Sequence, residues 1–300
     1  MKSLNFIVLL FCVLSCSSEA QKTKVIVDAD TGNEIDDFFA IVMALKSKNV
    51  DVIGLTAAHW NNQWAPDYDT MLKSWELNNQ ILEAMEVNIP SLKGSNTIVG
   101  APWSGIEPRK SEATDFIIKS ALSTKEGEKL KIICLGAATN IASSILINPD
   151  IIERIAIYYI GAKYDFENNA WDKNEFNVRN DLNAFDALLN EQNLELHILT
   201  NNISDKIVFN EDETLPRFNT DSKIEKLLLN RWKTWVTKRK IIDKKMYDIG
   251  IVEAVINPQL LQEIEISTPP ENTPRKIGVY SEINIEAMKN DFWELLKAKN

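Results

Sequence analysis

The sequence predicts one α/β domain with a mostly parallel central sheet and helices on both faces, a Rossmann-like open sheet. Three observations predict it. Apolar, β-branched runs alternate with stretches whose apolar residues recur at helical spacing. The runs are nearly continuous, which is typical of strands buried on both faces. Polar clusters follow several of them, at the position where the carboxyl ends of parallel strands collect ligands.

The first elements establish the alternation. Residues 24–30 (KVIVDAD) are predicted to be a strand because they are apolar and β-branched. Residues 35–48 carry apolar side chains at helical spacing and are predicted to be a helix. Residues 50–58 (VDVIGLTAA) then read as a second strand, and residues 68–85 as a second helix.

The later elements repeat this pattern. Three further strands are expected at 129–136 (KLKIICLG), 154–162 (RIAIYYIGA) and 194–200 (LELHILT). Helices are expected from Thr139 onward and at 181–190, 222–240 and 248–256. Strands that alternate with helices indicate a parallel sheet covered on both faces.

Length, composition and charge restrict the class of protein. The chain has 300 residues, 45% hydrophobic and 25% charged, which is enough for a large core. We find no internal repeat and no low-complexity tract. A net charge of −10 and a pI near 4.9 argue against nucleic acid or an anionic membrane surface as partner. We therefore expect a single domain over residues 21–300.

Residues 1–20 are predicted to be a targeting segment outside this domain. Lys2 precedes an apolar run, 6–14, that is too short to span a bilayer. Cys16 follows small and aliphatic residues, which resembles a bacterial lipoprotein signal whose cysteine becomes lipidated. The alternative is a secretory signal cleaved after Ala20. On the first interpretation the protein is exported and held by a lipid anchor to a membrane, facing the periplasm or the cell surface.

The stretch VIVDADTGNEIDDFFAI, residues 25–41, raises a question of electrostatics. It places five carboxylates between two flanks that read as buried and contains no Lys or Arg: Asp28, Asp30, Glu34, Asp36 and Asp37. Buried carboxylates repel one another unless something positive compensates them. A divalent cation such as Ca²⁺ or Mg²⁺ takes oxygen ligands and would do so. The alternatives are a solvated acidic loop, or Asp36 and Asp37 as favourable charges at a helix N-terminus.

Four segments resemble, in order, the inosine–uridine-preferring nucleoside hydrolase family. The first is the acidic stretch, which is similar to the family pattern D-x-D-P-G-x-D-D after a strand. The others are LGAATNIA (135–142), NNAWDKNEFN (168–177) and YDIGIVEAV (247–255). Together they extend over nearly the whole chain after the targeting segment, and four ordered motifs are far more specific than one D-x-D.

The resemblance implies a calcium site and a catalytic base. The ligands it implies are Asp30, Asp37, the backbone carbonyl of Thr139, and Asp248. All four supply oxygen, as the charge argument requires. Asp30 would also take a proton from a calcium-bound water that attacks the anomeric carbon of ribose.

The resemblance also implies a set of substrate contacts. Side chains expected around the ribose hydroxyls are Asp36, Asn61, Asn169, Glu175 and Asn177. Carboxylates and amides suit this task because vicinal hydroxyls need both acceptors and donors. Nearby carboxylates would stabilise an oxocarbenium-like transition state. For each asparagine, a role as a turn residue remains the alternative.

The chain departs from the family pattern in three places. Thr31 replaces the proline, and the residues NEI lengthen the loop before Asp36 and Asp37. Tyr247 stands where many members have the histidine thought to protonate the leaving base. We expect Tyr247 to stack on the base, and His59, which follows a predicted strand, to contact the base.

The predicted function is calcium-dependent hydrolysis of the N-glycosidic bond of ribonucleosides, giving ribose and free base, as in nucleoside salvage. One alternative is a non-catalytic lipoprotein that binds nucleosides or ribose. A metal-dependent phosphatase, which also begins with D-x-D after a strand, is the other. The expected partner is a small nucleoside, and a homo-oligomer stays open.

Overall fold

The computed structural model describes residues 22–60, 69–100 and 105–298. Within them, an eight-stranded sheet has the order β11-β12-β8-β5-β4-β1-β2-β3. Neighbouring strands run parallel except β11 and β12, which are antiparallel. The strands are β1 (Thr23–Ala29), β2 (Val50–Ala57), β3 (Ser91–Lys93), β4 (Leu130–Cys134), β5 (Ile155–Ile160), β8 (Glu195–Leu199), β11 (Leu261–Ser267) and β12 (Lys276–Ile283). The predicted fold class is confirmed.

Helices and two small hairpins complete the chain. The α-helices are α1 (Asp36–Lys46), α2 (Thr70–Met85), α3 (Glu112–Leu122), α4 (Thr139–Ile147), α5 (Phe176–Asn180), α6 (Leu182–Asn190), α7 (Asn201–Ser204), α8 (Glu211–Thr214), α9 (Lys223–Trp235), α10 (Tyr247–Ile256) and α11 (Ile285–Lys297). Short 3₁₀ helices are η1 (Pro149–Arg154), η2 (Leu215–Arg217), η3 (Thr237–Arg239) and η4 (Pro258–Leu260). The hairpins pair β6 (Lys163–Asp165) with β7 (Ala170–Asp172) and β9 (Val208–Asn210) with β10 (Asp243–Lys245).

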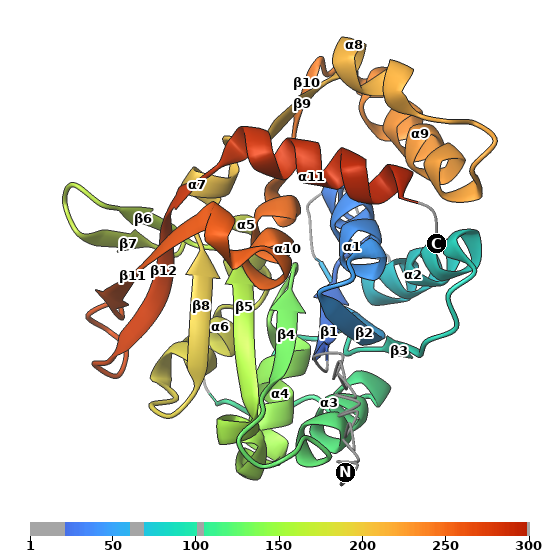
Figure 1. Ribbon diagram of the computed structural model, residues 1–300. Coiled ribbons are helices and arrows are strands. Elements are labelled where there is room, and N and C mark those ends of the chain that lie inside the picture. Colours follow the sequence, from blue (N-terminus) through green and yellow to red (C-terminus); the bar gives the residue numbers. More distant parts are fainter. Residues whose placement is uncertain (1–21, 61–68, 101–104, 299–300) are drawn as a thin grey trace, which may run out of the picture.

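The helices bury both faces of the sheet (Figure 1). On one face α1, α10 and α11 pack with the alternate side chains of the central strands, together with parts of α2 and α9. On the other face α3, α4 and α6 form a second apolar cluster around Ile132 and Tyr159. Successive strand residues point to opposite faces, which explains why the strands are apolar throughout.

The strand order reverses between β1 and β4. From β1 the chain proceeds to β2 and β3 on one side, whereas β4, β5 and β8 follow one another on the other side. The strand ends stay joined: the amide of Leu135 donates to the carbonyl of Asp28 at 2.8 Å. Loops that leave β1 and β4 in opposite directions open a crevice at their carboxyl ends, where ligands of α/β sheets bind.

The expected helices and strands are present, with boundaries shifted by a few residues. The helix expected at 222–240 ends at Trp235 and continues as η3. The elements not foreseen include the strands β3, β11 and β12, the helices α3 and α11, and the two hairpins. In the described ranges, no helix combines the length and the apolar character needed to cross a membrane. The predicted targeting segment, including Cys16, lies outside these ranges.

Candidate active site

A pocket opens at the carboxyl ends of β1, β4 and β5, at the crevice where the strand order reverses. Its walls come from the loop after β1, the starts of α1, α5, α7 and α10, and the ends of β4 and β5. The lining residues are Asp30, Asn33, Glu34, Asp36, Asp37, Leu135, Ile160, Glu175, Phe176, Asn177, Asn201, Tyr247 and Asp248. Seven of the predicted site residues line this pocket. The predicted site residues are described below in three groups, according to the cation, the ribose and the base.

The first group is an acidic cluster at two helix N-termini. Asp36 and Asp37 lie in the first turn of α1, and Asp248 lies in the first turn of α10. All three are buried, and a carboxylate oxygen from each lies within 4.8 Å of the others. Helix N-termini favour negative charge, which is why the sequence can place carboxylates here. Asp30, only 2% exposed, lines the same pocket.

The cluster has too few hydrogen-bond donors for its charge. Oδ2 of Asp30 and Oδ1 of Asp37 are buried and have no partner among the described residues. Burial raises the pKa of both carboxyl groups, and neighbouring carboxylates raise the pKa further. Burial and the same neighbours raise the pKa of Asp248. Oxygen atoms that are crowded, buried and unpartnered are the donor set that a hard divalent cation prefers, so the site fits such an ion.

Thr139, the fourth predicted ligand, is not among the lining residues. It begins α4, and its hydroxyl donates to Oδ2 of Asp181 at 2.6 Å. The residue of this loop that reaches the pocket is Leu135, whose carbonyl accepts from Nδ2 of Asn177 at 2.8 Å. Leu135 follows the last residue of β4, so its carbonyl lies at the sheet edge. In the sequence, the sign of this contact is that Leu135 directly follows an apolar strand, where a backbone carbonyl reaches the edge of the sheet.

The second group comprises the residues predicted to contact ribose. Glu175 and Asn177 line the pocket together with Asp36. Glu175 caps α5, where its Oε2 accepts from the amide of Val178 at 3.2 Å. Asn177 donates to the carbonyls of Leu135 and Ile160 and so joins the ends of β4 and β5.

Asn169, another predicted ribose contact, is not among the described residues that line the pocket. Asn169 is an exposed residue of the β6–β7 hairpin with φ 53°. Its Oδ1 accepts from the hydroxyl of Tyr164 at 3.2 Å, consistent with the turn role that was the alternative. Asn61 lies outside the described residues.

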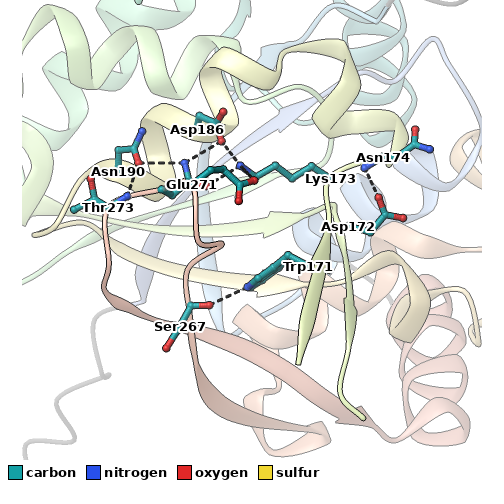
Figure 2. Close-up of polar contacts among 10 residues, drawn as sticks. Trp171, Asp172, Lys173, Asn174, Asp186, Asn190, Ser267, Glu271 and Thr273 are labelled. Carbon is teal, nitrogen blue, oxygen red and sulfur yellow. Dashed lines mark hydrogen bonds and ion pairs between the residues drawn. The ribbon is translucent and has the colours of Figure 1, made fainter. Parts of the chain in front are cut away.

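The segment that carries Glu175 and Asn177 is anchored to the rest of the domain (Figure 2). Nζ of Lys173 contacts Asp186 at 2.6 Å and Glu271 at 2.8 Å. Nε1 of Trp171 donates to the carbonyl of Ser267 at 2.9 Å. These contacts tie the strand before α5 to α6 and to the β11–β12 connection. They fix the direction from which Glu175 enters the pocket.

The third group concerns the base. Tyr247 lines the pocket and is half-buried, and Nζ of Lys244 lies 5.3 Å from the centre of its ring. Burial raises the pKa of the Tyr247 hydroxyl, so the phenol stays protonated at neutral pH. Stacking of the Tyr247 ring on the base stays a prediction.

His59 belongs to a buried network beside the pocket. Its Nε2 lies 2.9 Å from Oγ1 of Thr139. Because the Thr139 hydroxyl donates to Asp181, it accepts from His59, which fixes the hydrogen on Nε2. Burial lowers the pKa of His59 to about 4, so the imidazole is neutral. His59 is not among the lining residues, and its predicted contact with the base has no geometric support here.

Lys244 is a further residue of the site that was not predicted from the sequence. It projects from β10, and its Nζ lies 2.6 Å from Oε2 of Glu34 and 3.1 Å from Oδ1 of Asp36. Part of the acidic stretch is therefore neutralised by a lysine more than two hundred residues away. Arg231 adds a second anchor, because its guanidinium donates to the carbonyls of Gly32 and Glu34. The position of Lys244 four residues before Asp248 was visible, but the hairpin register that aims it was not.

Comparisons with known proteins point to one family. The profile of the family described as "Inosine-uridine preferring nucleoside hydrolase" matches residues 25–287. A probable uridine nucleosidase of Oryza sativa subsp. japonica is 24% identical over 70% of this chain and 68% of its own length. The pyrimidine-specific ribonucleoside hydrolase RihB of Escherichia coli is 26% identical over 53% of each chain, so the match spans about half of that relative. The structure of a plant nucleoside hydrolase superposes with a TM-score of 0.73 at 20% identity, covering 93% of this chain and 100% of that chain.

Proposed function

This chain belongs to the inosine-uridine preferring nucleoside hydrolase family, and we propose that it hydrolyses the N-glycosidic bond of ribonucleosides with the aid of Ca²⁺. The products would be ribose and the free base. The observation that carries the proposal is the composition of the pocket. Its lining combines buried carboxylates that have no hydrogen-bond partner among the described residues with Glu175 and Asn177.

Asp30, Asp37 and Asp248 are the side chains proposed to hold the cation, and the carbonyl of Leu135, which also lines the pocket, is a backbone candidate. Thr139 stays in the proposal only as the position implied by the family motif. When bound, a divalent cation supplies Lewis acidity that lowers the pKa of a neighbouring water.

Asp30 is proposed to be the general base. Its Oδ2 is buried and has no partner in the part of the chain that the structure describes, so it can accept the proton of an attacking water. The water oxygen forms a bond to the anomeric carbon while the bond to the base nitrogen breaks. The electron pair of the broken bond leaves with the base, which then takes a proton from solvent.

Asp36, Glu175 and Asn177 are proposed to orient the ribose. Their oxygens can accept from the sugar hydroxyls, and the two carboxylates stabilise positive charge that develops on the ring. Burial raises the pKa of Glu175, which identifies a carboxyl group withdrawn from water. Tyr247 at the pocket wall is proposed to stack on the base, as the sequence predicted.

The test is hydrolysis of uridine, cytidine, inosine and adenosine by the purified protein, followed as release of reducing sugar. Uridine comes first because the two curated relatives are named for uridine and pyrimidine substrates. We expect turnover that EDTA abolishes and Ca²⁺ restores. Release of ribose from none of the four would overturn the proposal and would favour the non-catalytic alternative. Family membership argues against the phosphatase alternative.

Export as a lipoprotein is a separate proposal that rests on residues 1–20 alone. Metabolic labelling with a radioactive fatty acid tests it. We expect label on the wild type and none on Cys16→Ala; label on both, or on neither, would contradict it. Whether copies of the chain associate is answered by light scattering after size-exclusion chromatography.

A further inference from the structure

Lys244 is a buried cation whose hydrogen-bonding capacity is fully used. Its side chain is 4% exposed, and Nζ contacts Oε2 of Glu34, Oδ1 of Asp36 and the carbonyl of Lys245. An ammonium group has three hydrogens, so none is left for a substrate. Lys244 therefore acts through the residues it holds.

The surroundings keep the ammonium group in place. It lies 5.3 Å from the ring centres of both Trp235 and Tyr247. Although burial opposes its charge, the carboxylates of Asp36 and Glu34 raise the pKa of Lys244 above its ordinary value. Two carboxylates and two aromatic rings therefore stabilise the ammonium group in this position.

The ion pairs of Lys244 distinguish two adjacent aspartates. Asp36 and Asp37 both lie in the first turn of α1, and both have an oxygen near Asp248. Oδ1 of Asp36 is used by Lys244, whereas Oδ1 of Asp37 has no partner among the described residues. The local charge therefore favours Asp37 over Asp36 as a cation ligand.

Glu34 belongs to the loop residues that depart from the family pattern. Its main chain is fixed by Arg231, and its side chain is fixed by Lys244. In this chain, Lys244 therefore binds a residue of the lengthened loop as well as Asp36.

We propose that Lys244 is a positioning residue that assigns the adjacent aspartates to different tasks. It neutralises Asp36 and keeps that carboxylate available to ribose, and it leaves Asp37 to the cation. This inference rests on the proposed function for its ribose part. Its cation part stands on the ion-pair geometry alone.

Calcium titration by calorimetry tests the cation part without turnover. In Lys244→Met the competing ammonium is lost and Asp36 becomes free to ligate, so we expect Ca²⁺ to bind roughly tenfold more tightly. Lys245→Met is the matched control. It removes the next lysine of β10, which pairs with Asp205 at the surface, and should leave the affinity unchanged.

A double-mutant cycle identifies Asp36 as the group that responds. Asp36→Asn alone should weaken calcium binding, because it removes a negative charge beside Asp37 and Asp248 and leaves Lys244 with one carboxylate and an excess positive charge. In the Asp36→Asn background, Lys244→Met should no longer tighten binding by the same factor, since the two groups act as a pair. Equal tightening with and without Asp36, or weaker binding in Lys244→Met, would overturn the proposal.

Glu34→Gln provides a second variant if Lys244→Met does not fold. It leaves Lys244 with one carboxylate and an excess positive charge, so calcium should bind more weakly, the opposite sign. Unchanged or tighter binding in Glu34→Gln contradicts the proposal. Absence of calcium binding in the wild type and in every variant also overturns it.

Kinetics with uridine tests the ribose part. Lys244→Met should raise KM roughly tenfold, as expected when a charged hydrogen-bonding group loses its position, and lower kcat less. Lys245→Met should match the wild type. A KM unchanged within about twofold would reject the ribose role. If the wild type hydrolyses no nucleoside, the proposed function fails, and the calcium cycle still decides the role of Lys244.

Discussion

Two neighbouring sets of buried carboxylates differ in the hydrogen-bond donors around them. Asp181 is 1% exposed and accepts from the Thr139 hydroxyl and from the amides of Val99 and Ala184. Asp30 and Asp37 are buried to a similar degree, yet each keeps an oxygen without a partner in the described ranges. Burial raises the pKa of all three carboxyl groups, so a raised pKa does not distinguish the two sets. The two sets differ instead in the number of hydrogen-bond donors around them. Carboxylates with enough donors stabilise the fold, whereas carboxylates with too few keep oxygens that a ligand can use.

Asp30→Asn tests the ligand side of this comparison and should have the largest effect. We expect kcat for nucleoside hydrolysis to fall by about 10²–10⁴-fold, the usual contribution of a general base. Without calcium the free energy of unfolding should stay the same or increase, because the substitution removes one charge from a repelling cluster. Steady-state kinetics measure kcat, and urea denaturation in EDTA measures the free energy of unfolding. A variant that unfolds more easily in EDTA would place Asp30 among the structural carboxylates.

Glu253 sharpens the comparison because it has an oxygen without a partner among the described residues but does not belong to the acidic cluster of Asp36, Asp37 and Asp248. It lies on α10, is fully buried, and its Oε1 has no partner among the residues described. Burial, and after it the charge of Asp291, raises the pKa of Glu253 to about 9. The folded state therefore keeps the proton between the ordinary pKa and about 9, whereas the unfolded state releases it.

Stability from this proton is present at acid pH and is lost as pH rises through that window, at most about 1.4 kcal/mol per pH unit. Glu253→Gln imitates the protonated acid, so its free energy of unfolding should depend less on pH between 5 and 8. Urea titrations at several pH values measure this. A variant with the same pH dependence as the wild type would show that Glu253 ionises normally.

Asp181→Asn tests the structural side. An amide group facing the donors of Val99, Thr139 and Ala184 leaves at least one of them unpaired, so we expect a loss of about 1–3 kcal/mol in the free energy of unfolding. Calcium affinity should stay within about twofold of the wild type. The comparison breaks if calcium affinity falls tenfold and stability does not change.

Tyr247 should give the smallest effect. Tyr247→Phe keeps the ring and should retain most activity, whereas Tyr247→Ala should lose about 1 kcal/mol of base affinity, a several-fold rise in KM. Steady-state kinetics on purine and pyrimidine nucleosides should show the larger loss for purines. A Phe variant as inactive as the Ala variant would make the hydroxyl a proton donor.

The sequence predicted the parts of the fold and site that depend on local pattern. β1 is a β-branched run, so the aspartates at its end and at the start of α1 lie at the carboxyl edge of the parallel sheet, where Asp248 at the start of α10 lines the same pocket. Parts that depend on side-chain direction were not predictable. Lys244 reaches Asp36 only through the register of the β9–β10 hairpin. The Thr139 hydroxyl donates to Asp181, and Leu135 lines the pocket directly after β4, whereas the predicted calcium contact of the Thr139 carbonyl stays a prediction.

The position of the pocket at the order reversal has a consequence for biosynthesis. Its acidic residues come from the first strand–helix unit and from α10, close to opposite ends of the chain. A ribosome must therefore complete most of the polypeptide before these carboxylates can meet, and contacts of such long separation form late in folding. A cation that needs both segments cannot guide the early steps. It would instead stabilise the completed domain. Once the sites are saturated, the free energy of unfolding would rise with the logarithm of the calcium concentration.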